Sequence, residues 1–191
     1  MPTYRFGIDI DGTVTDPGTF IPHLNEHFNK NLTLDDLVEY DLTRVLNVDE
    51  QSFARWMEEH EPMLYQKSVL ANDAKSILHK WEKQFELFYI SARPAKLHDI
   101  TEEWFQAFNL PYDHIELLGS HNKIEAAKEH KVDLFLEDKH DNAVDIAEIC
   151  QIPVILMNTP YNQMPVPTNV YRANSWQEAN QIVSDLFAIT K

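Results

Sequence analysis

The sequence predicts an α/β protein with a Rossmann-like parallel sheet and helices on both of its faces. From residue 84 onward, short apolar stretches rich in β-branched residues alternate with stretches of helical periodicity, and short turns join them. Strands that alternate with helices in this way form parallel sheets covered on both faces. Residues 17–83 carry helical periodicity and predict a small helical region inserted after the first strand.

The elements follow from local signals in chain order. The first strand is expected over residues 4–10, and Thr33 and Asp49 are predicted helix N-caps, each followed by acidic residues. The later elements are expected as strand 85–90, helix 95–108, strand 114–118, helix 122–130, strand 132–136, helix 141–150, strand 153–157 and helix 176–189. The Pro-rich segment 159–172 is predicted to be an ordered loop. Residues 1–16 and 84–191 would then form the α/β core, and residues 17–83 the helical region.

The composition limits the classes of partner. The chain has 191 residues, with 31 acidic against 16 basic side chains and a formal net charge of −15. This length predicts one domain, or one core with a modest insertion. Nucleic acids and anionic membranes require basic surfaces, so neither is an expected partner. An anionic ligand would need local cations that outweigh the overall field.

The single cysteine, Cys150, rules out an internal disulfide framework and fits a reducing compartment. The first residues, MPTYRFGIDIDGT, lack the apolar stretch of a signal peptide. The longest apolar runs are far shorter than the roughly 20 residues that span a bilayer. We therefore expect a cytoplasmic protein without a membrane partner. The sequence allows a homodimer but does not set the oligomeric state.

Reactive groups stand at the ends of four predicted strands. The first strand ends in Asp9-Ile10-Asp11-Gly12-Thr13 and the second in Ser91-Ala92-Arg93. Lys123 comes shortly after the third strand, and Glu137-Asp138 end the fourth. Because the carboxyl ends of parallel strands share one edge of the sheet, these groups should converge. Carboxylates bind a hard cation such as Mg²⁺, and a cation with a lysine suits a phosphate.

These residues resemble the motifs of the haloacid dehalogenase-like (HAD) superfamily. The run from Asp9 to Asp16 is similar to its first motif, DxDGTxxD, Ser91 to its second, Lys123 to its third and Glu137-Asp138 to its acidic fourth. The resemblance covers residues 4–18 and 84–158, and the family places a small helical cap between its first two motifs. Within the superfamily the chain most resembles the 5'(3')-deoxyribonucleotidases and related bacterial nucleotidases. The supporting features are Tyr40, Trp56 and His60 in the cap, the Ser91-Ala92-Arg93 turn, and Arg172 followed by Ser175-Trp176-Gln177-Glu178.

The resemblance implies roles for individual residues. Asp9 would attack phosphorus and form an aspartyl-phosphate, Asp11 would act as the acid and base, and Lys123 would stabilise the transition state. Mg²⁺ would be held by Asp9, the backbone carbonyl of Asp11, Asp138 and, directly or through water, Glu137. The phosphate would be bound by Ser91 and the amides of Gly12, Thr13 and Ala92. Arg93 would either clamp the phosphate or pair with an acidic residue of the cap.

The leading hypothesis is a Mg²⁺-dependent phosphomonoesterase acting on (deoxy)nucleoside monophosphates. One alternative is a phosphatase of another small phosphate, such as a sugar phosphate. A non-catalytic phosphate-binding module is the alternative of another class, although such a module does not need the acid Asp11. The cap aromatics are expected mainly to pack in a core, with one or two facing the substrate. The sequence does not show which of Tyr40, Phe53, Trp56 and His60 those are.

A second motif points to different chemistry. The run from His23 to His27 matches H-x-x-E-H, the inverted zinc-peptidase pattern, in which both histidines share a helix face. The run is short, follows Pro22 and lacks an evident third ligand. We therefore expect a solvated helix here rather than a zinc site.

Overall fold

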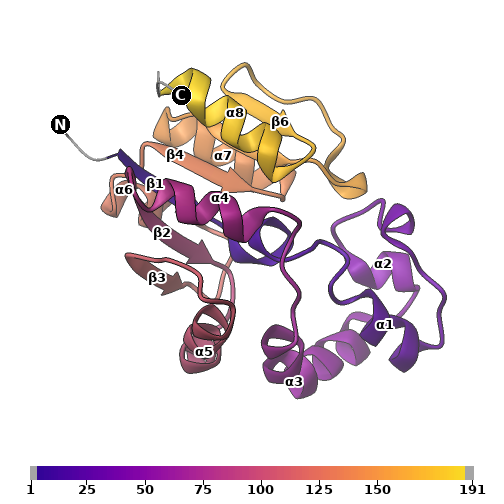
Figure 1. Ribbon diagram of the computed structural model, residues 1–191. Helices are drawn as coiled ribbons and strands as arrows, with labels where there is room; N and C mark the ends of the chain where they lie inside the picture. The colour runs from indigo at the N-terminus through magenta and orange to yellow at the C-terminus, as the bar shows by residue number, and fades with distance from the viewer. Residues whose placement is uncertain (1–3, 188–191) are drawn as a thin grey trace.

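The computed structural model describes residues 4–187 and contains a six-stranded sheet in the order β3-β2-β1-β4-β5-β6 (Figure 1). The strands are β1 Tyr4–Ile8, β2 Phe85–Ser91, β3 His114–Leu117, β4 Leu134–Glu137, β5 Val154–Met157 and β6 Val170–Ala173. Every neighbouring pair is parallel. The predicted α/β class with a parallel sheet is confirmed.

Helices cover both faces of this sheet, as predicted. The helices of the sheet layer are α4 Ala74–Trp81, α5 His98–Phe108, α6 Ile124–Glu129, α7 His140–Cys150 and α8 Trp176–Leu186. Along β4, Leu134 and Leu136 join the core shared with α4, α5 and α8, whereas Phe135 joins the core shared with α6 and α7. Successive strand residues point to opposite faces of the sheet, so this one short strand contributes side chains to the cores on both faces.

Helix α4 packs with the sheet and not with the inserted helices. Its apolar residues Ala74, Ile77, Leu78 and Trp81 belong to the same buried cluster as Phe6 of β1. The Trp81 indole also donates a hydrogen bond of 3.0 Å to Asn180 Oδ1 on α8. The sequence analysis assigned all of residues 17–83 to the helical region, and here the structure differs. Helical periodicity shows that a helix has an apolar face, but not which partner covers it.

The remaining inserted helices form a separate unit, which we call the cap. It contains α1 Ile21–Phe28, α2 Leu42–Leu46 and α3 Glu50–Gln66, grouped to one side of the sheet (Figure 1). Leu24, Leu46, Trp56 and Leu64 form its buried cluster. Asp49 caps α3 by accepting a hydrogen bond of 2.9 Å from the Ser52 amide. Thr33 starts a 3₁₀ turn over Leu34–Asp36 with a capping box, so both predicted N-caps are confirmed.

The chain enters and leaves the cap at one place. The Asp16 amide donates to the Val69 carbonyl at 2.9 Å, and the Ala71 amide donates to the Val14 carbonyl at 2.9 Å. Between these bonds, Thr15 and Leu70 form an antiparallel bridge. The two connecting segments therefore lie side by side next to the sheet.

Strand β6 corrects the prediction of a loop over residues 159–172. It pairs with β5 over four residues, from Val170 beside Val154 to Ala173 beside Met157. The strand is short, lies at the edge of the sheet and follows Pro167, so its local signal is weak. Helix α8 ends at Leu186, and positions 188–189 of the predicted helix lie outside the described residues. Within residues 4–187, no helix combines the length and the apolar character that crossing a membrane requires.

Candidate active site

Four charged residues meet where the central strands end. Asp9 follows β1, Glu137 ends β4, Asp138 comes next, and Lys123 directly precedes α6. All four side chains are buried. The Lys123 ammonium donates hydrogen bonds to Asp9 Oδ1 and, at 2.8 Å, to Glu137 Oε2. The structure thus brings together the residues that the sequence analysis assigned to the nucleophile, the lysine and the metal site.

The charges of this group do not balance. Oxygen atoms of Asp9, Glu137 and Asp138 lie within 4.8 Å of one another, and Lys123 forms ion pairs with Asp9 and Glu137. Burial raises the pKa of Asp9, although the Lys123 ammonium opposes the shift. Burial and the Glu137 carboxylate raise the pKa of Asp138 to about 7. Three buried carboxylates beside one ammonium form an oxygen-rich set that suits a hard divalent cation.

The turn after Asp9 brings the backbone close to Asp138. Gly12 has φ = 80°, and a Cβ at this position would lie 2.3 Å from Asp138 Oδ2. A side chain at residue 12 would therefore be strained and would collide with the carboxylate. The Gly12 amide, expected to bind phosphate, donates a hydrogen bond of 2.9 Å to Thr15 Oγ1 in this structure. Thr13 is buried, and its carbonyl accepts a hydrogen bond of 3.0 Å from the Trp176 indole.

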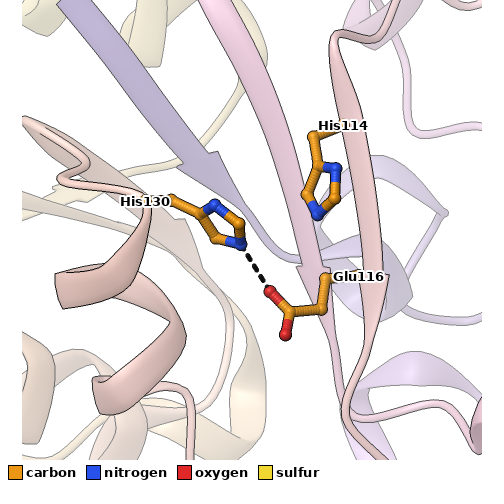
Figure 2. A group of neighbouring side chains, drawn as sticks. All are labelled: His114, Glu116 and His130. Carbon is orange, nitrogen blue, oxygen red and sulfur yellow. Dashed lines mark hydrogen bonds and ion pairs between the residues drawn. The ribbon is translucent and has the colours of Figure 1, made fainter.

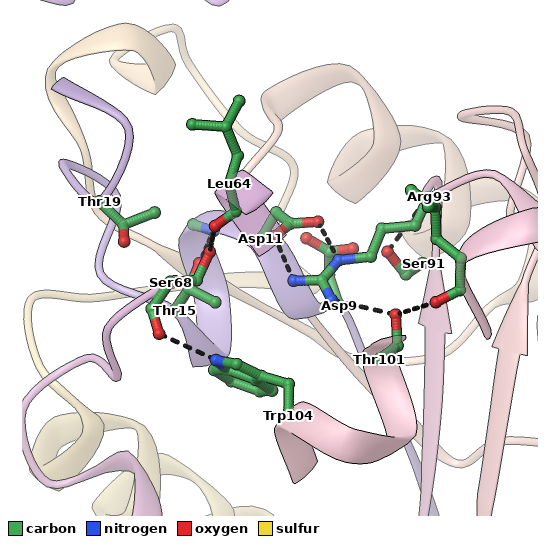
Figure 3. A network of polar contacts seen from close by, with 12 residues as sticks. Asp9, Asp11, Thr15, Thr19, Leu64, Ser68, Ser91, Arg93, Thr101 and Trp104 are labelled. Atoms are coloured by element: carbon green, nitrogen blue, oxygen red, sulfur yellow. Dashed lines mark hydrogen bonds and ion pairs between the residues drawn. The ribbon is translucent and has the colours of Figure 1, made fainter. Parts of the chain in front are cut away.

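Arg93 pairs with Asp11 of the core, not with an acidic residue of the cap. Its Nε donates to Asp11 Oδ2 at 2.8 Å and its Nη2 to Asp11 Oδ1 at 2.7 Å, which makes the pair bidentate (Figure 3). Its Nη1 donates to Thr101 Oγ1 at 3.2 Å, and the guanidinium stacks on the Tyr65 ring at 4.3 Å. The side chain is fully buried. Arg93 thus contacts the predicted acid and base itself, not a cap acid.

The segment after β5 fixes Asp138. The Tyr161 hydroxyl donates to Asp138 Oδ2, and Asn162 Nδ2 donates to the Asp138 carbonyl at 2.7 Å. Arg172 of β6 in turn donates to Asn162 Oδ1 at 3.0 Å. Neither Tyr161 nor Asn162 belongs to a motif that predicts a site residue. The available signal was the capping box of Thr159 and Asn162, which indicates an ordered turn but no function.

One cavity of about 640 Å³ joins this site to the cap. On the core side its lining includes Asp9, Asp11, Gly12, Ser91, Ala92, Arg93, Lys123, Glu137 and Asp138. On the cap side it includes Tyr40, Phe53, Met57 and Tyr65. Trp56 and His60 are not lining residues, and their rings stack on each other with centroids 5.3 Å apart. The sequence did not show which of four cap residues face the substrate, and two of them, Tyr40 and Phe53, line this cavity.

A match to a protein-family model shows which family this chain belongs to. A family model described as "5' nucleotidase, deoxy (Pyrimidine), cytosolic type C protein" matches residues 4–189. This chain belongs to that family. The nucleotidase family is one of hydrolases that act on phosphoric monoester bonds, so the chain is an enzyme of this class. The resemblance to the nucleotidase branch of the HAD superfamily is confirmed.

Curated relatives and solved structures agree with membership of the nucleotidase family. The chain is 54% identical over 181 residues to "Putative nucleotidase BH1399" of Halalkalibacterium halodurans, covering 95% of this chain and 93% of the relative. It is 33% identical over 187 residues to "Nucleotidase CA_C3379" of Clostridium acetobutylicum, covering 98% and 97% of the two chains. A HAD-like hydrolase structure from Streptococcus pneumoniae superposes with a TM-score of 0.68 at 10% identity, covering 97% and 98%. This last likeness shows the shared fold.

The H-x-x-E-H run lies on α1, away from the acidic group. Among residues 4–187, three groups of side chains are spaced to hold a metal ion, and none contains His23 or His27. The His27 ring instead packs against Phe28, with centroids 4.7 Å apart, and against His60 at 5.6 Å. These contacts fit a packed cap helix better than a peptidase site.

Proposed function

We propose that the protein is a Mg²⁺-dependent phosphomonoesterase that hydrolyses (deoxy)nucleoside monophosphates through an aspartyl-phosphate on Asp9. The observation that carries this proposal is the cavity itself. Its core side presents buried charged groups, and its cap side presents aromatic and thioether side chains. A nucleotide has matching ends, because its phosphate is doubly charged and its base has flat faces that stack on aromatic side chains.

The residues present fit a bound Mg²⁺. Asp9 and Asp138, with the Asp11 carbonyl and Glu137, would hold the ion, and all of them offer the oxygen ligands that it prefers. Burial is the largest cause that raises the pKa of Asp9 and of Asp138, and the neighbouring carboxylates raise both pKa values further. A bound Mg²⁺ would neutralise the carboxylates and the phosphate. A structure of the HAD hydrolase YfnB from Bacillus subtilis is described as bound to magnesium. Its fold is similar, with a TM-score of 0.63 at 14% identity, and the match covers 96% of this chain and 100% of that one.

The chain's own groups would carry out two displacements at phosphorus. In the first, an Asp9 oxygen attacks, the bond from phosphorus to the ester oxygen breaks, and Asp11 gives that oxygen a proton. In the second, Asp11 takes a proton from a water molecule, which attacks phosphorus and breaks the bond to Asp9. Lys123, held between Asp9 and Glu137, would stabilise the negative charge that develops on the phosphoryl oxygens.

Arg93 would position the Asp11 carboxylate for the second of these proton transfers, in which Asp11 takes a proton from water. The two parallel hydrogen bonds fix the plane of the Asp11 carboxylate, and Thr101 and Tyr65 fix the guanidinium. These bonds use three of the five N–H donors of the guanidinium, and we assign Arg93 to positioning Asp11 rather than to binding phosphate. Phosphate binding would therefore depend on Ser91 and the Ala92 amide, which line the cavity, and on Lys123.

The cap side favours a nucleotide over a sugar phosphate. Phe53, Met57 and Tyr65 present apolar surface, and Tyr40 lies near Lys139, whose ammonium is 4.6 Å from the ring centroid. Aromatic side chains stack well on bases, and each such contact contributes about 1–3 kcal/mol. A sugar phosphate has no flat group that would use this surface.

A panel of monophosphates tests the substrate class. Deoxyribonucleoside and ribonucleoside monophosphates are compared with the base-free 2-deoxyribose 5-phosphate, with Mg²⁺ and with Mg²⁺ removed by a chelator. We expect a higher kcat/KM for nucleotides than for the sugar phosphate, and loss of activity in the chelator. Equal kcat/KM values would favour the sugar-phosphate alternative, and binding without turnover would favour a phosphate-binding module.

Replacement of the proposed nucleophile tests the mechanism. Asp9→Asn should abolish turnover while the circular dichroism spectrum and thermal unfolding remain those of a folded protein. The matched control is Asp35→Asn, because Asp35 is an exposed carboxylate on the cap. Near-normal turnover by Asp9→Asn would contradict the aspartyl-phosphate mechanism.

A further inference from the structure

A second group of possible metal ligands lies at the edge of the sheet, outside the cavity. It consists of His114 and Glu116 of β3 and His130, the residue that follows α6 (Figure 2). One ligand atom from each residue lies within 4.8 Å of the other two. From these positions and the chemistry of the three side chains we propose that they form a binding site for one divalent transition-metal ion, with Zn²⁺ as the best match.

The backbone already directs the three side chains to one place. His114 and Glu116 are two residues apart on a strand, so they point to the same face of the sheet. The intervening Ile115 and the following Leu117 are buried in the core on the opposite face. His130 approaches from the end of α6, and its carbonyl accepts a hydrogen bond of 3.0 Å from Arg5 Nη1. Little backbone movement is therefore needed to close the group around an ion.

A metal ion would replace one existing hydrogen bond, the one between His130 and Glu116. His130 Nε2 and Glu116 Oε2 are 2.6 Å apart, and the two imidazole rings have centroids 4.7 Å apart. Within residues 4–187, the ring nitrogens of His114 have no hydrogen-bonding partner. Around an ion with bonds of about 2.0–2.1 Å, tetrahedral ligands lie roughly 3.4 Å from one another. Small side-chain rotations from the observed separations would reach that spacing.

The residues around the three side chains favour an ordered metal site over an exposed ion pair. The Phe88 ring packs against both imidazoles, with centroids 5.7 Å from His114 and 5.1 Å from His130. The side chains of His130 and Glu116 are 19% and 31% exposed, which leaves room for a water molecule as a further ligand. An apolar side chain next to a metal site restricts the access of solvent and lowers the local dielectric constant, which strengthens the attraction between the ion and its ligands.

The ligand chemistry separates this group from the catalytic carboxylates. Two imidazole nitrogens and one carboxylate oxygen suit Zn²⁺, whereas Mg²⁺ prefers oxygen ligands alone. A bound ion would tie the edge strand β3 to the end of α6, the helix that directly follows Lys123. The expected role is therefore to stabilise this part of the core.

Titration with Zn²⁺ tests the proposal on the full chain. Excess Mg²⁺ is present to occupy the carboxylate site, and binding is followed by calorimetry and, with Co²⁺ in place of Zn²⁺, by visible absorption. We expect one Zn²⁺ per chain. At a free Zn²⁺ concentration of 100 times Kd, the unfolding temperature should rise by about 5–10 °C. His114→Ala and Glu116→Gln should each weaken binding at least about tenfold and, at the same Zn²⁺ concentration, reduce the temperature shift to about half or less.

Two control variants identify the site. Asp138→Asn changes the carboxylate group, and His23→Ala changes the H-x-x-E-H run, so both should bind Zn²⁺ as the wild type does. Glu116→Gln keeps the size of the side chain, so it remains informative if His114→Ala fails to fold. The proposal would be overturned by the absence of Zn²⁺ binding, by unchanged binding in the folded His114 or Glu116 variant, or by loss of binding in either control.

Discussion

The core side and the cap side of the cavity are built by opposite physical means. The core side consists of charged groups that are buried and tied to one another, such as Asp9, Lys123 and Glu137. The cap side is made largely of apolar surface from residues such as Phe53 and Met57, in a small cluster of its own. Fixed charges stabilise a transition state, whereas apolar contacts bind substrate and transition state alike. Core substitutions should therefore lower kcat, and cap substitutions should raise KM.

After Asp9→Asn, which should abolish turnover, the largest effect is expected for Lys123→Met. The substitution removes the cation that contacts Asp9 and Glu137 and that would stabilise the phosphoryl oxygens. Loss of one such electrostatic group lowers kcat by about 10²–10³. Steady-state kinetics with a nucleoside monophosphate measure the change. Lys128→Met is the matched control, because Lys128 is an exposed lysine on the same helix. A normal kcat in Lys123→Met would contradict the assignment of catalysis to the core side.

Arg93→Lys should have the next largest effect. A lysine keeps the charge but cannot make the bidentate pair with Asp11, and it stacks less well on Tyr65. Hydrogen bonds to charged groups contribute about 1.5–3 kcal/mol, so kcat should fall about 10- to 100-fold with a smaller change in KM. The control is Arg44→Lys on the exposed surface of the cap. A change confined to KM would instead indicate that Arg93 binds substrate.

Phe53→Ala tests the cap side. It should raise KM for nucleotides about tenfold, because one stacking surface is lost, and leave kcat nearly unchanged. Hydrolysis of 2-deoxyribose 5-phosphate should not change, since this substrate has no base. Val38→Ala provides a control, because Val38 is exposed and does not line the cavity. An equal loss of activity on both substrates would show that Phe53 does not contact a base.

The smallest effect is expected for Asp49→Ala, measured as stability against pH. Asp49 accepts a hydrogen bond from the Ser52 amide, and this bond holds the pKa of the Asp49 carboxyl below its usual value. The contribution to stability is therefore present above the unfolded-state pKa of about 3.9 and is lost as the pH falls through the lower folded-state value. Thermal unfolding should separate wild type and variant at pH 6, and the two curves should approach each other near pH 3. A constant difference would exclude this linkage.

The sequence predicts the strands and site residues of the core better than the arrangement of the cap. Apolar runs that end in Asp9, Ser91 and Glu137 predicted both the strands and the edge at which they meet. The pairing of Arg93 with Asp11 was not predictable, because the residues are 82 positions apart and no local signal links them. Tyr161 was missed because its segment has the composition of a loop.

The cap aromatics illustrate the limit of periodicity. Phe53 and Trp56 lie three residues apart on α3 and both have helical spacing, yet Phe53 lines the cavity and Trp56 is buried in the cap cluster. Trp81 has similar spacing and packs against the sheet. The sequence shows that these side chains need burial, and the tertiary structure decides where they find it.

The paired segments at the base of the cap have a consequence for engineering and for divergence within the fold. Because Asp16 and Val69 are joined by a backbone hydrogen bond of 2.9 Å, the whole stretch between them begins and ends at almost one point. Such a stretch can be exchanged as a cassette, since a replacement of another length or shape need only start and finish side by side. The catalytic scaffold would keep its reaction while the exchanged cassette supplied a new specificity, provided that the cassette again placed a ring such as Tyr65 against Arg93.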